Sequence, residues 1–425
     1  MFACLFLALL AGVTFAQPAK DEPPAVTWDT LKDRMKWESE HGFTGVVLVA
    51  RDGQILLHEA YGMANRDKQI PMKHDTILAI GSTPIDFTKA GILLLAQQGK
   101  LNLSDPISKF FDQVPDDKKA MTLEQLMTGR SGLPDFHDIP SDKDKDHSWI
   151  DRDEAVRRIL GSELLFAPGK GRRHSHSAFG LLAAIIEKVS GQSYQDFTRE
   201  HLYQPAGMTD TGFFGDKIAP ERMALGYGPR KDGEINAPPY WGKTSWLVMG
   251  SGGQTSTALD MWRWVQAVHG GKLLNEDSRR VYGGKGDILV GGDLYGFYIM
   301  YAGDHRNCMI IMSNAVRPRF NKSVEQLGNS LAGLVAGRGP GKFTLGVELD
   351  LNDASQVKVA TVVPGGSADR SGLRAGDVLK SINGKPIGDD LREMLGTVLQ
   401  AGKAFEFGIE REGKPLTVTI KPEAR

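Results

Sequence analysis

His174 and His176, two positions apart, are side chains whose type and spacing suggest chemistry. In an extended segment, residues two apart point to the same side, so both imidazoles would lie on one face. With Asp135 or His137 as further ligands, the pair makes a metal site conceivable, because zinc binds imidazole and carboxylate groups. Two histidines alone are a weak signal, however, and we expect no metal and no other cofactor.

Ser82 is a second candidate, because it stands directly before Thr83 and Pro84. Serine or threonine ahead of proline is typical of a helix N-terminus, where the hydroxyl caps free backbone amides. Capping alone would explain this serine. The same hydroxyl becomes a nucleophile when a neighbouring base, such as an imidazole, takes its proton.

The elements that must position these residues follow from hydrophobic period and turn residues. Apolar runs on both sides of Asp52-Gly53 predict a β-hairpin. Strands come first, helices follow and strands return, which indicates an α+β fold with an antiparallel sheet and a helical insert. The expected elements are a helix over Trp28 to His41, a helix from near Ser82 to Gln98, helices over Ala178–Val189 (ended by Gly191) and Ser256–His269, and a strand pair over Phe297–Ala302 and Cys308–Asn314.

Composition limits the class of function. The 425 residues carry a formal net charge of −1, so no basic excess indicates a nucleic-acid partner. Residues 1–16 form an apolar stretch of signal-peptide length that ends in small residues, which predicts a secreted or periplasmic protein. After removal of that segment Cys308 is the only cysteine, so no internal disulfide is possible.

Four segments, in order along the chain, resemble the serine β-lactamase-related and penicillin-binding-protein-like family, especially its class C, D-aminopeptidase and esterase-like branch. They are Ile80–Ile85, Leu126–Pro134, Phe166–Gly169 with the helix that follows it, and Gly250–Asp260. The resemblance implies a β-lactamase/DD-peptidase-like fold over residues 17–335, with an antiparallel sheet flanked by helices plus a helical subdomain.

The resemblance also shows where the expected active site has changed. Ser82 holds the position of the family's nucleophile, but Ile85 holds the position of the lysine that takes its proton, and an isoleucine cannot accept one. Further family positions are occupied as follows: His174 replaces the tyrosine and His176 the asparagine of the second motif, Val290 replaces the basic residue of the third motif, Gly129 replaces a loop histidine, and Asp293 supplies one backbone amide of the oxyanion site beside that of Ser82.

Two functions remain open. Loss of a set of groups that activates a nucleophile as a unit lowers the rate by about 10⁶, which favours a pseudoenzyme or binding module that retains a cleft for a cell-wall peptide or a small ester or amide. The alternative is an atypical serine hydrolase (an esterase, peptidase or amidase) with Ser82 as nucleophile and His174 as base. Ordinary β-lactamase activity is not expected in either case.

Residues 342–425 resemble a bacterial PDZ domain and follow a glycine-rich linker at residues 336–341. Leu345, Gly346 and Val347 match its carboxylate-binding loop, and residues 389–400 match its groove helix. Successive amides in such a loop hold a terminal carboxylate while a strand edge pairs with an extended peptide. The resemblance therefore implies a peptide or protein C-terminus as a partner.

Overall fold

The computed structural model describes residues 23–136, 148–228, 236–283, 288–294, 296–315, 321–337, 343–350, 356–387 and 391–424. The predicted signal peptide, His137 and most of the predicted linker lie outside the described residues. Among the helices of the described part, none is long and apolar enough to cross a membrane.

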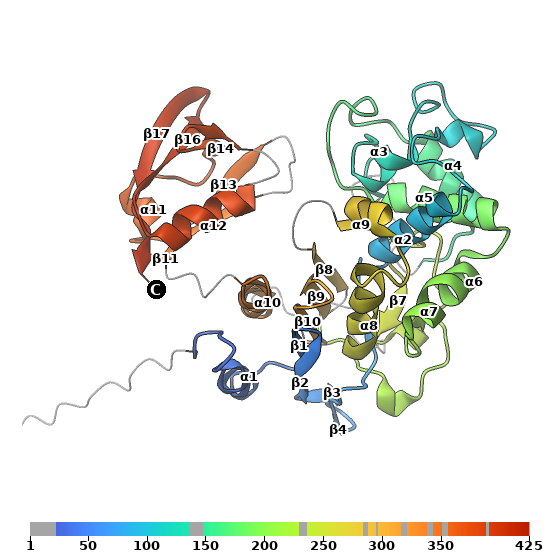
Figure 1. Cartoon of the computed structure of the whole chain (residues 1–425), viewed down its shortest axis with the longest axis horizontal. Helices are drawn as coiled ribbons and strands as arrows, with labels where there is room; N and C mark the ends of the chain where they lie inside the picture. The colour runs from blue at the N-terminus through green and yellow to red at the C-terminus, as the bar shows by residue number, and fades with distance from the viewer. Residues whose placement is uncertain are drawn as a thin grey trace, which may run out of the picture.

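A five-stranded antiparallel sheet forms the centre of the N-terminal unit (Figure 1). The strand order is β2-β1-β10-β9-β8, so strands from the two ends of this unit lie side by side in the middle. In the β1–β10 pair, Val47 lies opposite Ile311. This arrangement confirms the expectation of an antiparallel sheet in which early and late strands meet around a helical insert.

Side chains of β1 (Gly45–Arg51) alternate between two cores, as the period of a strand requires. Val46 and Leu48 face the larger core, which includes side chains of the helical insert. Val47 and Val49 face the second core, which includes side chains of helices α1 and α10. Both faces of β1 are therefore covered, which explains why this segment is apolar almost throughout.

The helices of this unit are α1 (Leu31–Glu40), α2 (Pro84–Gln97), α3 (Leu123–Met127), α4 (Arg152–Gly161), α5 (His176–Ser190), α6 (Tyr194–Thr198), α7 (Gln204–Ala206), α8 (Ala258–His269), α9 (Glu276–Gly283) and α10 (Asn321–Val335). Its strands, besides β1, are β2 (Gln54–Tyr61), β3 (Met63–Asn65), β4 (Ile70–Pro71), β5 (Leu78–Ala79), β6 (Gly212–Phe213), β7 (Gln254–Ser256), β8 (Ile288–Leu294), β9 (Phe297–Gly303) and β10 (Cys308–Ser313). These bounds confirm the expected helices and strand pairs to within a few residues, and Gly191 caps α5 in the left-handed conformation.

The C-terminal unit has its own core and its own sheet, in the order β12-β13-β14-β16-β17. A hairpin between β16 and β17 turns at Glu412-Gly413, and both residues have a positive φ. Its elements are β11 (Phe343–Thr344), β12 (Val347–Asp350), β13 (Val357–Val362), α11 (Ser367–Arg370), β14 (Val378–Ile382), β15 (Lys385–Pro386), α12 (Leu391–Ala401), β16 (Phe405–Arg411), β17 (Lys414–Ile420) and β18 (Glu423–Ala424).

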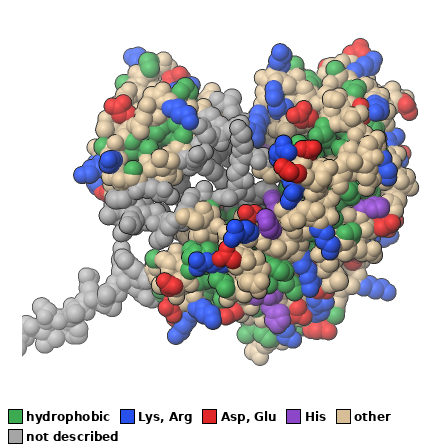
Figure 2. Space-filling model, viewed as in Figure 1, with side chains coloured by type: hydrophobic (Ala, Val, Ile, Leu, Met, Phe, Trp, Pro, Cys, Tyr) green, Lys and Arg blue, Asp and Glu red, His purple; other side chains and the backbone are tan. Residues whose placement is uncertain are grey.

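Figure 2 shows basic and acidic side chains interspersed over the described surface of one face, without a large patch of one sign. This distribution agrees with the near-zero net charge.

Candidate active site

The N-terminal ends of α2 and α5 form the candidate site, and the packing of these two helices brings them together. Gly91 on α2 leaves room for Ile186 on α5, since a Cβ at position 91 would lie only 2.9 Å from the Ile186 Cδ1 atom. Nearer the start of α2, the Thr88 hydroxyl donates to the carbonyl of Gly250 at 2.6 Å. Helix α2 is thereby fixed against both α5 and the glycine-rich turn.

Ser82 lies in the turn that leads into α2, directly after Gly81 with its positive φ of 48°. The N-cap residue of the helix is Thr83, and its side chain makes no capping hydrogen bond. The Oγ of Ser82 lies 2.9 Å from Nε2 of His176. Capping therefore does not account for this serine, because its hydroxyl meets an imidazole.

His176 is the first residue of α5, and the preceding N-cap fixes its position. The Ser175 hydroxyl accepts from the backbone amide of Ala178 and donates to the carbonyl of Pro134 at 3.0 Å. The start of α5 is thus tied to the loop that carries Asp135. Serine is a preferred N-cap residue, so the local sequence favours this helix start.

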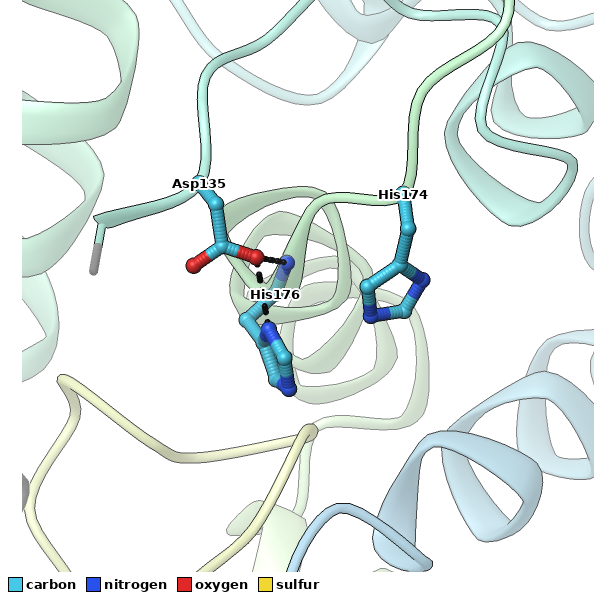
Figure 3. A group of neighbouring side chains, drawn as sticks. All are labelled: Asp135, His174 and His176. Atoms are coloured by element: carbon cyan, nitrogen blue, oxygen red, sulfur yellow. Dashed lines mark hydrogen bonds and ion pairs between the residues drawn. The ribbon is translucent and has the colours of Figure 1, made fainter. Parts of the chain in front are cut away.

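Asp135 accepts two hydrogen bonds from His176 through one carboxylate oxygen (Figure 3). Its Oδ2 lies 2.9 Å from the backbone nitrogen and 2.6 Å from Nδ1 of the ring. An ionised carboxylate only accepts hydrogen bonds, so Nδ1 carries the proton in this pair. Nε2 then presents its lone pair to the Ser82 hydroxyl.

The three side chains form a serine–histidine–aspartate relay that is largely shielded from water. The exposed fraction is 17% for the His176 side chain and 10% for that of Asp135. A nucleophile, a base and a group that orients the base are the three parts of an activated-serine site, and they are recognised by geometry, not by sequence position. This arrangement is able to generate a serine alkoxide for attack on a carbonyl.

The base assigned from the sequence, His174, is corrected by this geometry. The histidine hydrogen-bonded to Ser82 is His176, because α5 begins there and directs its ring toward the start of α2. His174 precedes the N-cap, is exposed, and lies with its ring centroid 4.8 Å from that of His176. Sequence reasoning considered Asp135 only as a possible metal ligand and missed its orienting position.

Ile85 stands on the first turn of α2 and packs, half-buried, against the larger core. Lys89, the nearest lysine further along the helix, donates to the backbone carbonyl of Tyr282 at 2.6 Å. Burial lowers the pKa of Lys89, and the nearby charge of Asp86 opposes this shift. Lys89 is therefore directed toward Tyr282 and does not take the place of the lysine that Ile85 replaces.

Val290 and Asp293 lie on β8, the edge strand of the sheet, opposite Tyr301 and Tyr298 of β9. The side chains of β8 lie outside the described part, so the roles expected of these two residues stay predictions.

An apolar pocket lies beside the relay. Phe136 and Ser177, which directly follow Asp135 and His176 in the chain, belong to its lining together with Ile150, Ile159, Trp246 and Leu247. The Phe136 ring centroid is 6.1 Å from that of His176. The lining therefore presents mainly apolar side chains next to Asp135 and His176.

In the C-terminal unit, Leu345 is buried in the core and Gly346 adopts a positive φ of 67°. Val347 opens β12, which is the edge strand of its sheet. The expected groove helix corresponds to α12. A turning loop next to a free strand edge is the arrangement that binds an extended peptide.

Comparisons with known proteins agree with this architecture. Residues 29–282 match the family model described as Beta-lactamase, and residues 344–421 match the model described as PDZ domain. The first match ends before β8, β9 and β10, although these strands complete the central sheet.

The chain is 30% identical over 251 residues to Penicillin-binding protein 4* of Bacillus subtilis, covering 56% of this chain and 55% of that protein. It is 28% identical over 304 residues to the putative penicillin-binding protein PbpX of the same organism, covering 72% and 74%. The chain thus spans only about half of the first relative.

Among solved structures, the D-amino acid amidase of Ochrobactrum anthropi aligns with a TM-score of 0.59 and 23% identity, over 71% of this chain and 96% of that one. A penicillin-binding protein from Bacillus halodurans aligns with a TM-score of 0.57 and 24% identity, over 68% and 98%. At these identities the likeness concerns the fold.

Proposed function

Because the chain belongs to the β-lactamase family and carries a C-terminal PDZ domain, we propose that it is a serine hydrolase that uses Ser82 as nucleophile, His176 as base and Asp135 as the orienting carboxylate. The observation that carries the proposal is the hydrogen bond of 2.9 Å between Ser82 Oγ and His176 Nε2, continued by the 2.6 Å bond to Asp135. These two contacts support the hydrolase over the pseudoenzyme.

In the first half-reaction, Ser82 Oγ attacks the carbonyl carbon of an ester or amide while its proton passes to His176 Nε2. The imidazolium that forms is stabilised by the Asp135 carboxylate, which also holds the ring in the productive tautomer. Collapse of the tetrahedral intermediate breaks the bond to the alcohol or amine, which takes the proton from Nε2. The product is an acyl-enzyme on Ser82.

In the second half-reaction, water attacks the acyl carbonyl and His176 accepts the proton of the water. The acyl–Oγ bond then breaks, the proton returns to Ser82, and the carboxylic acid leaves. The apolar pocket lined by Phe136, Trp246 and Leu247 supports a substrate with an apolar group beside the scissile bond.

In this proposal the PDZ domain binds a partner. The loop Leu345-Gly346-Val347 and the free edge of β12 support binding of a peptide or protein C-terminus. The domain would then bring the hydrolase to a protein partner. Export to the periplasm or the exterior is included in the proposal, on the strength of the apolar segment at residues 1–16.

The deciding experiment is the intact mass of the folded protein after incubation with a fluorophosphonate and, in a separate sample, with a penicillin. A fluorophosphonate adduct on wild type, absent from Ser82→Ala, supports the proposal, because attack by Oγ displaces fluoride. Absence of an adduct on protein with a native circular dichroism spectrum would overturn it. The binding-module alternative would then be preferred, and the PDZ groove would become the site to study.

A further inference from the structure

A second imidazole, which the hydrolase mechanism does not use, lies beside the proposed relay. His174 is exposed and its ring stands nearly perpendicular to that of His176, at an interplanar angle of 86°. Figure 3 shows both rings and the Asp135 carboxylate gathered at the start of α5. One ligand atom from each of Asp135, His174 and His176 lies within 4.8 Å of the others.

Two imidazoles and a carboxylate are a ligand set that zinc accepts, and three protein ligands leave a fourth position for water. Tetrahedral bonds of about 2.0–2.2 Å place ligand atoms roughly 3.3–3.6 Å apart. The three donors therefore need to shift by about 1 Å. A rotation of the exposed His174 side chain would supply most of this shift, because Asp135 is held by the backbone amide of His176.

Two electrostatic contributions at this site act on a bound cation with opposite sign. The positive end of the α5 dipole opposes a cation, and the Asp135 carboxylate offsets it. The whole Asp135 residue is only 7% exposed, so metal binding would remove little further water from its carboxylate.

We propose that Asp135, His174 and His176 form a binding site for zinc or a similar divalent transition metal, and that metal bound there reversibly inhibits the serine hydrolase. A metal bound to Nε2 of His176 would occupy the lone pair that takes the proton of Ser82. A metal bound to Nδ1 would break the contact with Asp135 that orients the ring. Metal binding is independent of the proposed function, whereas inhibition rests on it, so the two are tested separately.

Binding is measured on the full chain by titration with Co²⁺, whose visible absorption reports nitrogen and oxygen ligands, and by competition between the protein and a chromophoric chelator for Zn²⁺. Wild type and Ser82→Ala are both expected to bind one metal ion per chain. His174→Ala is expected to bind at least about 100-fold more weakly, since loss of an outer-sphere partner alone weakens metal binding about 10–100-fold.

The matched control is His305→Ala, which removes an exposed histidine from the turn between β9 and β10. It should bind the metal as wild type does. Failure of Ser82→Ala and wild type to bind Co²⁺ or Zn²⁺, or binding by His174→Ala as tight as that of wild type, would overturn the proposed site whatever the catalytic activity.

Inhibition is measured as hydrolysis of a p-nitrophenyl ester with increasing Zn²⁺. Wild type should lose at least tenfold in rate at saturating Zn²⁺ and regain it with EDTA. His174→Ala, compared with its own metal-free rate, should resist the same concentrations. Zinc that binds wild type without slowing it, or activity that is lost on chelation, would overturn the inhibitory role; the second result would indicate metal-dependent hydrolysis instead.

Discussion

The Oγ of Ser82 and Nε2 of His176, 94 residues apart in sequence, lie 2.9 Å from each other. Each is placed by a helix start: Ser82 by the turn into α2 and His176 by the first position of α5. In the proposed hydrolase this contact would supply the base at a site where Ile85 stands in place of the family's lysine. The serine would then be activated from the neighbouring helix and not from the helix that it precedes.

Alanine variants of His176 and His174 test which of the two histidines acts as the base. His176→Ala should lower kcat for a p-nitrophenyl ester by about 10²–10⁴, the usual contribution of a general base. His174→Ala, at the neighbouring exposed position, should lose far less. Equal losses in the two variants, with unchanged thermal unfolding, would mean that the 2.9 Å contact is not used in catalysis.

The charge of Asp135 is tested by Asp135→Asn, which keeps the size of the side chain. The amide cannot stabilise the imidazolium as the carboxylate does, so kcat should fall by about 10²–10⁴ while KM changes little. Asp153→Asn, at an exposed aspartate on α4, is the control and should retain full activity. A loss confined to KM would indicate that Asp135 contributes to substrate binding instead.

Ile85→Lys should not restore acylation by penicillin. A lysine there would recover one proton acceptor, but the tyrosine and basic positions are still held by His174 and Val290. The new ammonium would also replace a side chain that packs against the core. Labelling with a fluorescent penicillin, with Ser82→Ala as the blank, provides the measurement. Strong labelling of the single variant would show that the other replacements matter little.

Gly132 supports the loop that carries Asp135, and its replacement should destabilise the N-terminal unit. Gly132 has a φ of +80°, and a Cβ there would lie 2.0 Å from the backbone oxygen of Phe166. Gly99 has a similar φ of +69° but open space around it, so Gly99→Ala measures the conformational penalty alone, about 1–2 kcal/mol. Gly132→Ala should lose about 1–3 kcal/mol more in urea unfolding. An equal loss of unfolding free energy in Gly132→Ala and Gly99→Ala would show that the loop shifts to accommodate the new Cβ.

Asp377 and Arg411 form a pair that is expected to stabilise the PDZ domain above pH 4. The Arg411 guanidinium donates to both carboxylate oxygens at 2.7 Å, and the exposed fraction of the Asp377 side chain is 1%. Burial alone would raise the pKa of Asp377, but Arg411 and the backbone amide of Arg374 together outweigh it and hold the pKa below the ordinary value of 3.8. Asp377→Asn should lower the free energy of unfolding by about 2 kcal/mol at neutral pH.

Because the pKa of the folded state is the lower one, this contribution is fully present above the unfolded value of 3.8 and is lost as the pH falls through the folded value. The difference between wild type and Asp377→Asn should therefore stay constant from pH 7 to about pH 5 and shrink below pH 4. Glu406→Gln, at an exposed position on β16, is the control and should show little effect. A pH-independent difference would contradict the charge-based explanation.

Local patterns in the sequence were sufficient for the elements and for much of their order. The apolar runs around Asp52-Gly53 encode the β1–β2 hairpin, and Gly191 ends α5, because turn geometry and helix termination depend on neighbouring residues alone. The antiparallel pairing of β1 with β10 also followed, from the return of strands after the helices. Replacement of the family's lysine by Ile85 was readable in the same way.

The choice between His174 and His176 was decided by tertiary structure alone. Both are histidines in one short segment, and no local pattern says which ring meets a serine 94 residues away. The packing of Gly91 against Ile186 sets the approach of α2 to α5, and the bond from Ser175 to Pro134 sets where Asp135 lies. The sequence by itself determined which candidate residue types are present, and long-range packing decided which of them lie within hydrogen-bond distance.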